Sequence, residues 1–280
     1  KIQWKEAFGG QLYKANATLT SVEQGITDIG WVFSYLEPAK MPLAQLSVHT
    51  PFTTSDPRIV LGAMNEMIEK NPAFRGEWDK YNVVFLGATA SDTYDLFTKF
   101  PIKSIDDLKG KKMRIQSSKV LEEQMRALGS LPQVMAFSEV YQALQTGVVD
   151  GTENPISNLY TQKMHEVQKH LTITDHGYLG YAVIVNKKFW DGLPADVRGQ
   201  LETAMKESTA YANKMAKEQN DKDLDSVKKS GKTTVYVPTK EERMAFKKVL
   251  VPVHQKMESR IGKEIIQSVY KETGFDPSSL

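Results

Sequence analysis

The pattern of apolar and polar positions is clearest in residues 112–155, where it predicts two strands alternating with two helices. Residues 113–115 form a short strand of apolar and basic positions, and residues 120–128 carry apolar side chains at helical spacing. Residues 133–136 are again extended, and we expect Ser138 to cap the second helix. Strands joined through a helix pair in parallel, so the carboxyl ends of both strands are predicted to lie at one sheet edge, where ligands bind.

Two polar side chains belong to that predicted edge, and each has a structural alternative. Arg114 offers a planar, permanently charged fork that suits a carboxylate. Its alternative is an exposed arginine on an edge strand, or one paired with Glu139 or Asp107. Asn154 is restricted to extended backbone by the proline that follows, and its amide can bind a carboxylate or hydroxyl. Its alternative is the N-cap of a helix that begins at Pro155.

The remaining chain predicts strands and helices in mixed order. Strands are expected at residues 1–8, 28–33, 82–90, 93–100, 170–174, 178–186 and 233–237. Helices are expected from Asn16 or Thr18 to Gly25, at residues 56–68, 155–164 and 194–229, and as a pair within 240–272. Residues 38–52 contain three prolines and are expected to be irregular. The inner face of the long helix is predicted to carry Leu201, Ala204, Met205, Tyr211 and Met215.

This order predicts an α/β protein of two lobes, each built from discontinuous segments. The first lobe is expected to comprise residues 1–91 and 180–219, and the second residues 92–179 and 220–280. The extended run 93–100 follows a strand without an intervening helix, which suits a passage from one lobe to the other. The sequence shows no internal repeat and no low-complexity linker.

Composition narrows the class of protein. The 280 residues are 40% hydrophobic and 25% charged, as in ordinary globular proteins, and the formal net charge of +2 gives no reason to expect a nucleic-acid partner. No apolar run approaches the roughly 20 residues of a membrane-spanning helix. The absence of cysteine excludes disulfides, thiolate metal sites and cysteine nucleophiles, and it fits an oxidising bacterial compartment. Because the chain opens at Lys1 directly in a strand-like pattern, we expect sequence upstream of it to have been removed.

Candidate chemistry is sparse apart from aromatic residues. Aromatic side chains lie near predicted strand ends and could line a small-molecule cleft, although each alone is more often part of a core: Trp31, Phe33, Tyr35, Tyr94, Phe137, Tyr178 and Tyr181. The five histidines show no metal-binding spacing, and the nucleophile, phosphate-loop and dinucleotide motifs are missing, so neither metal nor cofactor is expected.

Four segments in order resemble one family. KGKKMRIQ, MAFSEVYQALQTGVVDGTENP, KMHEVQKHLTITDHGY and NKKFWDGLP are similar to the extracytoplasmic substrate-binding subunits of TRAP transporters, the DctP family, and the resemblance extends over residues 1–240. It implies a periplasmic binding protein fold of two α/β lobes with mixed sheets and a long lobe-spanning helix. It also implies a periplasmic, monomeric receptor that binds an organic anion, usually a carboxylate, and delivers it to a sodium-driven membrane permease.

The resemblance also assigns expected site residues. Arg114 matches the family arginine that salt-bridges the ligand carboxylate, Asn154 the asparagine of the ENP segment, and Phe137 an aromatic residue that packs on the ligand. Pocket-lining roles are implied for Trp31, Phe33 and Tyr94, and the expected ligand-binding set is completed by Ser117 and Tyr178. The second arginine and the acid that some sialic-acid binders carry near Tyr94 and Phe33 are absent, which favours a less polar or aromatic carboxylate. The family's first strand and helix have no counterpart here, so this set is expected to be incomplete.

Two alternatives use the same cleft for another purpose. An enzyme acting on carboxylic acids would need a general base, for which Asp92, Glu139, Glu153 and His176 are the candidates. No recognisable spacing gives any of them an orienting partner. A ligand sensor would bind its ligand in the same cleft, but it would act on a signalling partner instead of a membrane permease.

Overall fold

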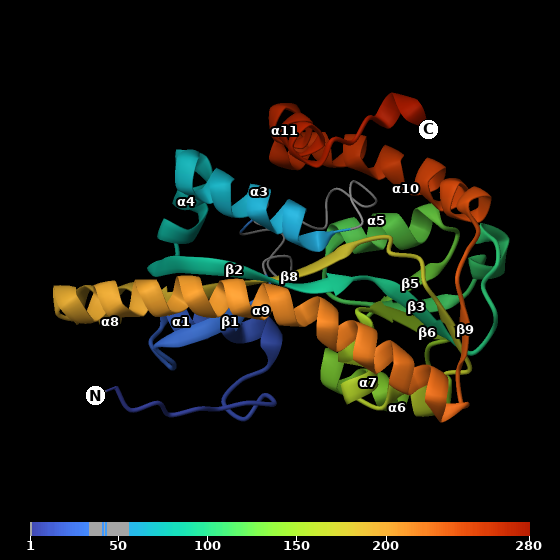
Figure 1. Cartoon of the computed structure of the whole chain (residues 1–280), viewed down its shortest axis with the longest axis horizontal. Helices are drawn as coiled ribbons and strands as arrows, with labels where there is room; N and C mark the ends of the chain where they lie inside the picture. Colours follow the sequence, from blue (N-terminus) through green and yellow to red (C-terminus); the bar gives the residue numbers. More distant parts are fainter. Residues whose placement is uncertain (1, 34–40, 42, 44–55) are drawn as a thin grey trace.

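The structure is a computed structural model that describes residues 2–33, 41, 43 and 56–280. Tyr35, His49 and nearly all of the predicted irregular segment 38–52 lie outside the described residues. Within the described chain the fold is α/β, with two sheets and a long helix (Figure 1).

The first sheet has three antiparallel strands in the order β1–β8–β2. These are β1 (Ile29–Val32), β8 (Tyr178–Asn186) and β2 (Val83–Thr93). One face of β1 packs closely on α1 (Thr18–Glu23), because a Cβ on Gly30 would lie 2.6 Å from Val22 Cγ2. The core on this side also contains Trp78 of α4 (Pro72–Asp79), which follows α3 (Pro57–Lys70).

The second sheet has six strands of mixed direction in the order β5–β4–β6–β3–β7–β9. Its strands are β5 (Leu131–Val134), β4 (Lys112–Ile115), β6 (Gly151–Asn154), β3 (Asp95–Thr98), β7 (His170–Thr172) and β9 (Thr234–Tyr236). β4 is parallel to both β5 and β6, whereas β3 is antiparallel to β6 and β7.

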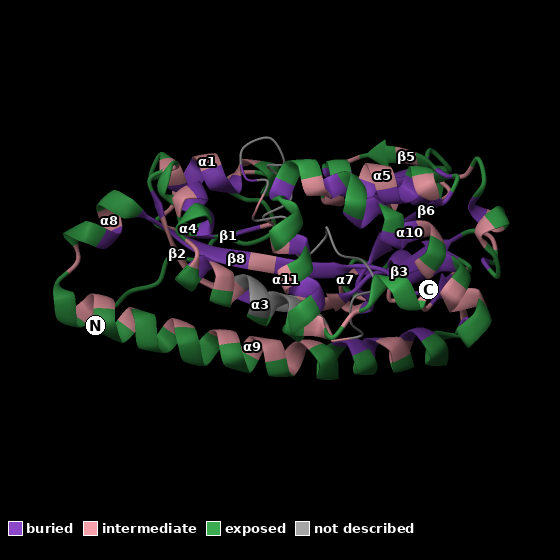
Figure 2. Ribbon diagram, turned by 90° about the horizontal axis from the view of Figure 1, so that it is seen from above, coloured by how far each residue is buried: buried purple, intermediate pink, exposed green. Residues whose placement is uncertain are grey.

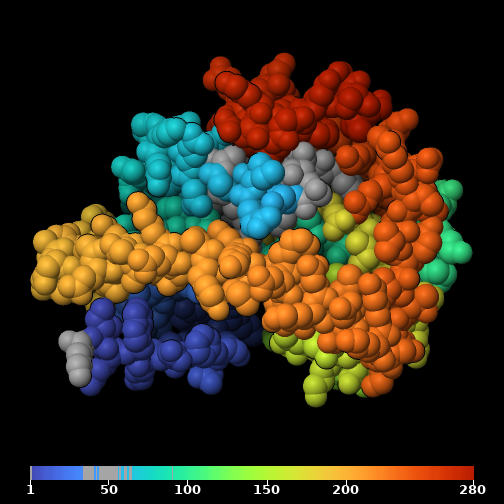
Figure 3. Space-filling model, viewed as in Figure 1, coloured from blue at the N-terminus to red at the C-terminus, as the bar shows by residue number. Residues whose placement is uncertain are grey.

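Helices cover both faces of this second sheet. These are α5 (Lys119–Ala127) and α10 (Lys240–Ile261) on one face and α6 (Val140–Thr146) and α7 (Ile156–Thr161) on the other. The remaining helices after β8 are α8 (Lys187–Gly192), which contacts β8 and β2, α9 (Ala195–Ser230) and α11 (Lys263–Thr273). On one face Met113 and Ile115 pack in a core with residues of α5 and α10, and on the other Phe97 packs with residues of α6 and α7. α10 contacts α5 and α11 contacts α3, so the C-terminal pair reaches from the second sheet to the helices of the first (Figures 1 and 3).

The chain passes between the sheets at three places. β2 continues into β3 with only Tyr94 between them, and a short link of residues 173–177 joins β7 to β8. α9 is the third passage, and at 1.5 Å per residue its 36 residues extend over about 54 Å. It contacts β2 and α7, and Figure 2 shows its outer side exposed and its buried positions toward its C-terminal half.

The strands and helices predicted within residues 112–155 form in the predicted order, although the second strand is Leu131–Val134 and a further strand, β6, ends the segment. Three expectations are wrong. Residues 2–8 are not a strand, and Trp4 is 64% exposed, because an alternating pattern needs a neighbouring strand and the described chain places none beside it. Ser138 does not cap α6, because Phe137–Glu139 forms a 3-10 turn and the helix begins only at Val140.

The third error concerns two of the five residues expected on the inner face of α9; the other three, Leu201, Met205 and Met215, are half-buried as expected. Tyr211 is 66% exposed and Ala204 is exposed as well. The inward stripe instead uses mostly small or polar residues at helical spacing, namely Met205, Thr209, Ala212, Ala216, Asn220, Asp223 and Val227. Small residues are needed because α9 approaches the β2 backbone closely, and a Cβ on Gly87 would lie 3.2 Å from Thr209 Oγ1.

Candidate functional site

The carboxyl ends of β4, β5 and β6 meet at one edge of the six-stranded sheet, and the strand register decides which side chains share a face. Arg114 is in register with Thr152 of β6, and Phe97 of β3 is in register with the same Thr152. Residues in register on neighbouring strands point to the same face, so Arg114 and Asn154 lie on the face that α6 and α7 cover.

Arg114 is held in place by its neighbours. The residue is 1% exposed and belongs to an interior strand, so the alternative of an exposed edge-strand arginine is wrong. Its Nε and Nη2 donate to the carbonyl oxygen of Met135 at 3.1 and 2.8 Å. Its Cζ lies 5.5 Å from the centroid of the Phe137 ring, within the range of a cation–π contact. The plane of the guanidinium is therefore fixed.

The two acids considered as partners of Arg114 are engaged elsewhere. Glu139 Oε1 lies 3.7 Å from Lys14 Nζ, and both side chains of this ion pair are exposed. Asp107 accepts hydrogen bonds from the backbone N–H groups of Lys103 and Ser104, and these bonds hold the pKa of its carboxyl below the usual value. Neither acid forms the pair that the sequence allowed.

Asn154 is completely buried at the end of β6. Within the described part of the chain, neither its amide oxygen nor its amide nitrogen has a hydrogen-bond partner. The alternative of an N-cap is wrong, because α7 begins at Ile156 with Pro155 as N-cap and without a side-chain cap bond. Buried polar groups are nearly always paired, so this amide is an exception that retains its full capacity to donate and accept.

A second polar group lies on the opposite face of the same sheet edge. His176 Nε2 lies 2.8 Å from Glu153 Oε2, and His176 Nδ1 lies 2.7 Å from Thr174 Oγ1. His176 and Glu153 are 1% and 2% exposed in their side chains. Glu153 Oε1 has no partner among the described residues. Because both nitrogens of this imidazole are engaged and the ring is buried, it is poorly placed to take a proton from a bound molecule.

The link between β7 and β8 connects this group to a cluster of carboxyl groups. Asp175 Oδ1 accepts from Thr93 Oγ1 at 2.7 Å, and Asp175 N donates to Asp95 Oδ1 at 3.1 Å. Burial raises the pKa of Asp95 well above its usual value, with the charge of Asp175 as a second cause. We call Thr93, Asp95, Glu153, Thr174, Asp175 and His176 the crossing network.

Burial also raises the pKa of Asp92, to about 6, although the N–H of Thr93 opposes the shift by donating to its carboxylate at 2.8 Å. This carboxyl group lies beside the crossing network and lines a cavity of about 490 Å³ against α9. Lys217 and Asp221 of α9 line the same cavity and are paired with one another at 3.2 Å.

Three further residues of the expected site, Tyr94, Tyr178 and Ser117, differ in how far they are buried. Tyr94 and Tyr178 are both completely buried where the chain passes between the sheets. Tyr94 packs so closely on the link that a Cβ on Gly177 would lie 2.8 Å from its ring. Ser117 is exposed in the bend between β4 and α5.

Trp31 and Phe33 form a separate aromatic cluster around Tyr181. The ring centroids of Phe33 and Trp31 lie 4.4 and 6.3 Å from that of Tyr181. Trp31 is 59% exposed and lines a cavity of about 420 Å³ beneath α9. The Tyr181 hydroxyl lies 3.4 Å from the amide of Asn158 in α7, which connects this cluster to the helix that follows Asn154.

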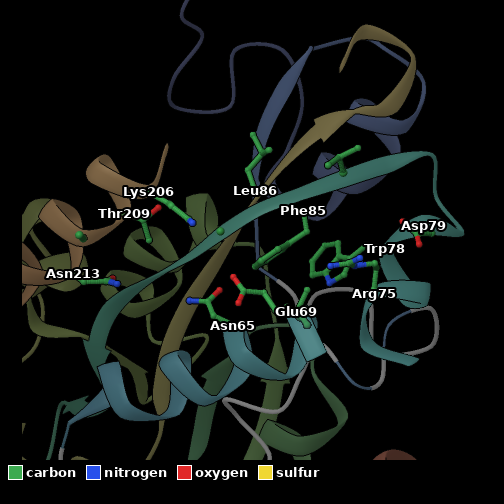
Figure 4. Close-up of a pocket in the computed structure, with 14 residues that line it drawn as sticks. Asn65, Glu69, Arg75, Trp78, Asp79, Phe85, Leu86, Lys206, Thr209 and Asn213 are labelled. Carbon is green, nitrogen blue, oxygen red and sulfur yellow. The ribbon is translucent and has the colours of Figure 1, made fainter. Parts of the chain in front are cut away.

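A larger cavity, of about 630 Å³, lies elsewhere. It lies between α3, α4, β2 and α9, and Figure 4 shows Trp78 and Phe85 on one side and Lys206, Thr209 and Asn213 along α9 on the other. None of the expected site residues lines it. Size alone therefore does not locate the site that Arg114 and Asn154 indicate.

Sequence reasoning missed the groups that hold the predicted residues in place. The Met135 carbonyl is a backbone acceptor, and no side-chain pattern could identify it. The pairing of Glu153 with His176 joins residues 23 positions apart, and its only sequence signal was that both are titratable residues near predicted strand ends.

None of the described helices is both long and apolar enough to cross a membrane.

The sequence of the chain matches one protein family and several characterised relatives. The family model "Bacterial extracellular solute-binding protein, family 7", DctP, matches residues 1–260. The chain is 66% identical over 173 residues to the C4-dicarboxylate-binding periplasmic protein DctP of Rhodobacter capsulatus, covering 62% of this chain and 52% of that protein. It is 40% identical over 169 residues to the C4-dicarboxylate-binding protein DctB of Bacillus subtilis, covering 60% and 48%. The matches thus span about half the length of these curated relatives.

Solved structures show the same fold. A TRAP periplasmic solute-binding protein from Shewanella oneidensis with bound succinate aligns with a TM-score of 0.85 and 30% identity, covering 94% of this chain and 86% of that one. A second, from Sulfurospirillum deleyianum and also with bound succinate, aligns with a TM-score of 0.84 and 34% identity, covering 93% and 84%.

Proposed function

Because the chain belongs to family 7 of the bacterial extracellular solute-binding proteins, the DctP family, we propose that it is a receptor for one small organic anion. The anion binds between the two sheets and is passed to a TRAP membrane permease. The observation that carries the proposal is the buried Arg114 guanidinium, fixed by Met135 and sharing a sheet face with the unpartnered amide of Asn154. The family is one of binding proteins, so the enzyme alternative is not retained.

We propose a C4-dicarboxylate as the ligand. The support is that the Rhodobacter capsulatus and Bacillus subtilis relatives are C4-dicarboxylate-binding proteins and that two solved neighbours contain bound succinate. A permanently charged planar fork matches one carboxylate, and burial of that carboxylate costs little only if it is paired. This choice replaces the aromatic or weakly polar acid that the aromatic residues suggested, because Tyr94 and Tyr178 are buried and Trp31 and Phe33 group around Tyr181.

The receptor is proposed to close around its ligand as two lobes, residues 1–91 with 180–219 and residues 92–179 with 220–280. Support comes from the separate sheets and from the two short passages between them, β2 to β3 and β7 to β8, each of which reaches the next strand within a few residues. Hinges of this kind need only a few residues to absorb the change in backbone angles. The expected setting is the periplasm, and the expected state a monomer.

Isothermal titration calorimetry with succinate, malate and fumarate tests the proposal, with benzoate as the aromatic comparison. We expect one dicarboxylate per chain and no heat from benzoate. Mass spectrometry of small molecules released from the denatured protein checks the result without a choice of candidates. Binding of none of these acids, together with a non-acidic molecule in the released fraction, would overturn the proposal.

A further inference from the structure

One residue of the link between β7 and β8 has an unusual backbone conformation. Asp175 has φ of +45°, a left-handed value that is uncommon outside glycine, although Asn, Asp and His adopt it more often than other residues do. Its two neighbours, Thr174 and His176, are each 1% exposed. Such a conformation persists only where surrounding contacts fix it, and it is more frequent at functional positions.

The contacts that fix Asp175 come from three elements. Its Oδ1 accepts from Thr93 Oγ1 at the end of β2 at 2.7 Å, and its backbone N–H donates to Asp95 Oδ1 at the start of β3 at 3.1 Å. Its Oδ2 forms an ion pair with Arg243 of α10. Asp175 therefore ties both short passages between the sheets to each other and to a C-terminal helix.

These ties lead directly to the end of β6. Asp95 is in register with Asn154, so the strand that Asp175 holds is the strand that lies beside the unpartnered amide. The next residue of the link, His176, contacts Glu153, the neighbour of Asn154 in β6. A shift of the link would move β3 and the last two residues of β6 together.

We propose that Asp175 is a positioning residue for the ligand site: clamped by Arg243, it holds the passages between the sheets so that the Asn154 amide faces the bound anion correctly. The effect on the ligand rests on the proposed function, whereas the clamp itself can be tested without any ligand.

Hydrogen exchange of the free protein, measured by mass spectrometry, tests the clamp. The Asp175→Asn variant keeps an acceptor for Thr93 and loses the ion pair, so amides of residues 94–98 and 151–154 should exchange about ten times faster than in the unchanged protein. Asp221→Asn is the matched control, because it removes a negative charge from the adjoining cavity without touching the link. Equal exchange in the two variants would overturn the clamp.

Succinate titrations then separate positioning from simple support of the fold. Asp175→Asn and Arg243→Gln should each weaken binding about tenfold at a temperature where both are fully folded. The double variant should lose no more than either alone, and Arg243→Lys should recover part of the loss. Unchanged affinity in the variants despite faster exchange would overturn the positioning role. If the unchanged protein binds no dicarboxylate, the proposed function fails, and hydrogen exchange alone decides whether the clamp exists.

Discussion

The edge of the six-stranded sheet carries the buried His176–Glu153 pair on one face and the Asn154 amide on the other, and they differ in how far the protein satisfies them. The His176 ring has partners at both nitrogens, in Thr174 and Glu153, although Glu153 Oε1 lacks one among the described residues. On the other face, the amide of Asn154 has none among the described residues. A satisfied network supports the fold, whereas a buried group left unpaired costs stability and needs another reason to be kept.

Burial alone therefore does not distinguish a structural polar residue from a binding residue. Arg114, Asn154 and His176 are all almost inaccessible to solvent. What separates Asn154 from His176 is that the Asn154 amide has no partner among the described residues, whereas both nitrogens of the His176 ring are engaged. Each prediction below tests one side of this contrast.

The largest effect is expected from Arg114→Ala. A buried carboxylate that loses its only charged partner costs about 3–5 kcal/mol, so affinity for succinate should fall by roughly two to four powers of ten in calorimetry. Arg114→Lys should also bind weakly, because an ammonium cannot reproduce the planar fork. Arg126→Ala on α5, whose side chain is 63% exposed, is the control and should bind normally. An Arg114→Ala variant with unchanged affinity would remove this residue from the site.

The next effect concerns pH and the carboxyl groups beside the crossing network. Burial raises the pKa of Asp92 from 3.8 to about 6, so the folded state binds this proton more tightly than the unfolded chain does. Its contribution to stability is therefore complete below about pH 4 and is lost as the pH rises through 6. The difference between the two pKa values corresponds to about 3 kcal/mol.

Chemical unfolding at pH 4 to 7 measures this contribution against Asp92→Asn, which keeps an acceptor for the Thr93 N–H and does not ionise. Over that range the unchanged protein should lose on the order of 3 kcal/mol relative to the variant. Parallel pH profiles for the two proteins would show that Asp92 does not titrate as its burial implies.

A smaller effect is expected from Asn154→Leu. Affinity for succinate should fall by about 1–3 kcal/mol, because a hydrogen-bonding amide is lost, while the free energy of unfolding stays equal or rises. Asn186→Leu is the matched contrast, since that buried amide donates to Val22 O at 2.8 Å and accepts from Phe189 N at 2.9 Å. It should destabilise the protein by about 1–3 kcal/mol. Equal destabilisation by both substitutions would contradict the distinction drawn here.

The smallest effect is expected from Trp31→Ala, which tests whether the aromatic cluster belongs to the site. Trp31 is 59% exposed and packs near Tyr181, so its removal should change succinate affinity by less than about 0.5 kcal/mol. A tenfold loss of succinate affinity in calorimetry would instead indicate that Trp31 lines the ligand pocket, as the resemblance to the family implied.

Local patterns predicted the elements of the fold well where the signal came from neighbouring residues. The strands and helices of residues 112–155 and the long helix, which ends at Gly231 with φ of +65°, follow from spacing and turn chemistry. Residues 2–8 show the limit, because strand formation depends on a partner that the pattern does not contain.

The candidate site was predictable in its residue types and not in its geometry. Arg114 was found because it lies within a predicted strand, and Asn154 because it lies in the turn predicted to close the segment; that Asn154 ends a strand parallel to β4 was not predicted. The backbone acceptor at Met135, the register of Asp95 with Asn154 and the ion pair of Asp175 with Arg243 all depend on long-range packing. No local pattern of apolar and polar residues encodes such contacts.

The central position of β8 in the three-stranded sheet has a consequence for how the protein reaches its native state. β1 pairs at Trp31 with Val183, so this sheet cannot close until most of the chain has been synthesised. Strands β1 and β2 have unpaired edges until β8, with which both pair, has been synthesised. Pairings so distant in sequence form slowly. A nascent chain with this topology is therefore prone to aggregation for longer than one built from local hairpins, and chaperones can bind it before β8 completes the sheet.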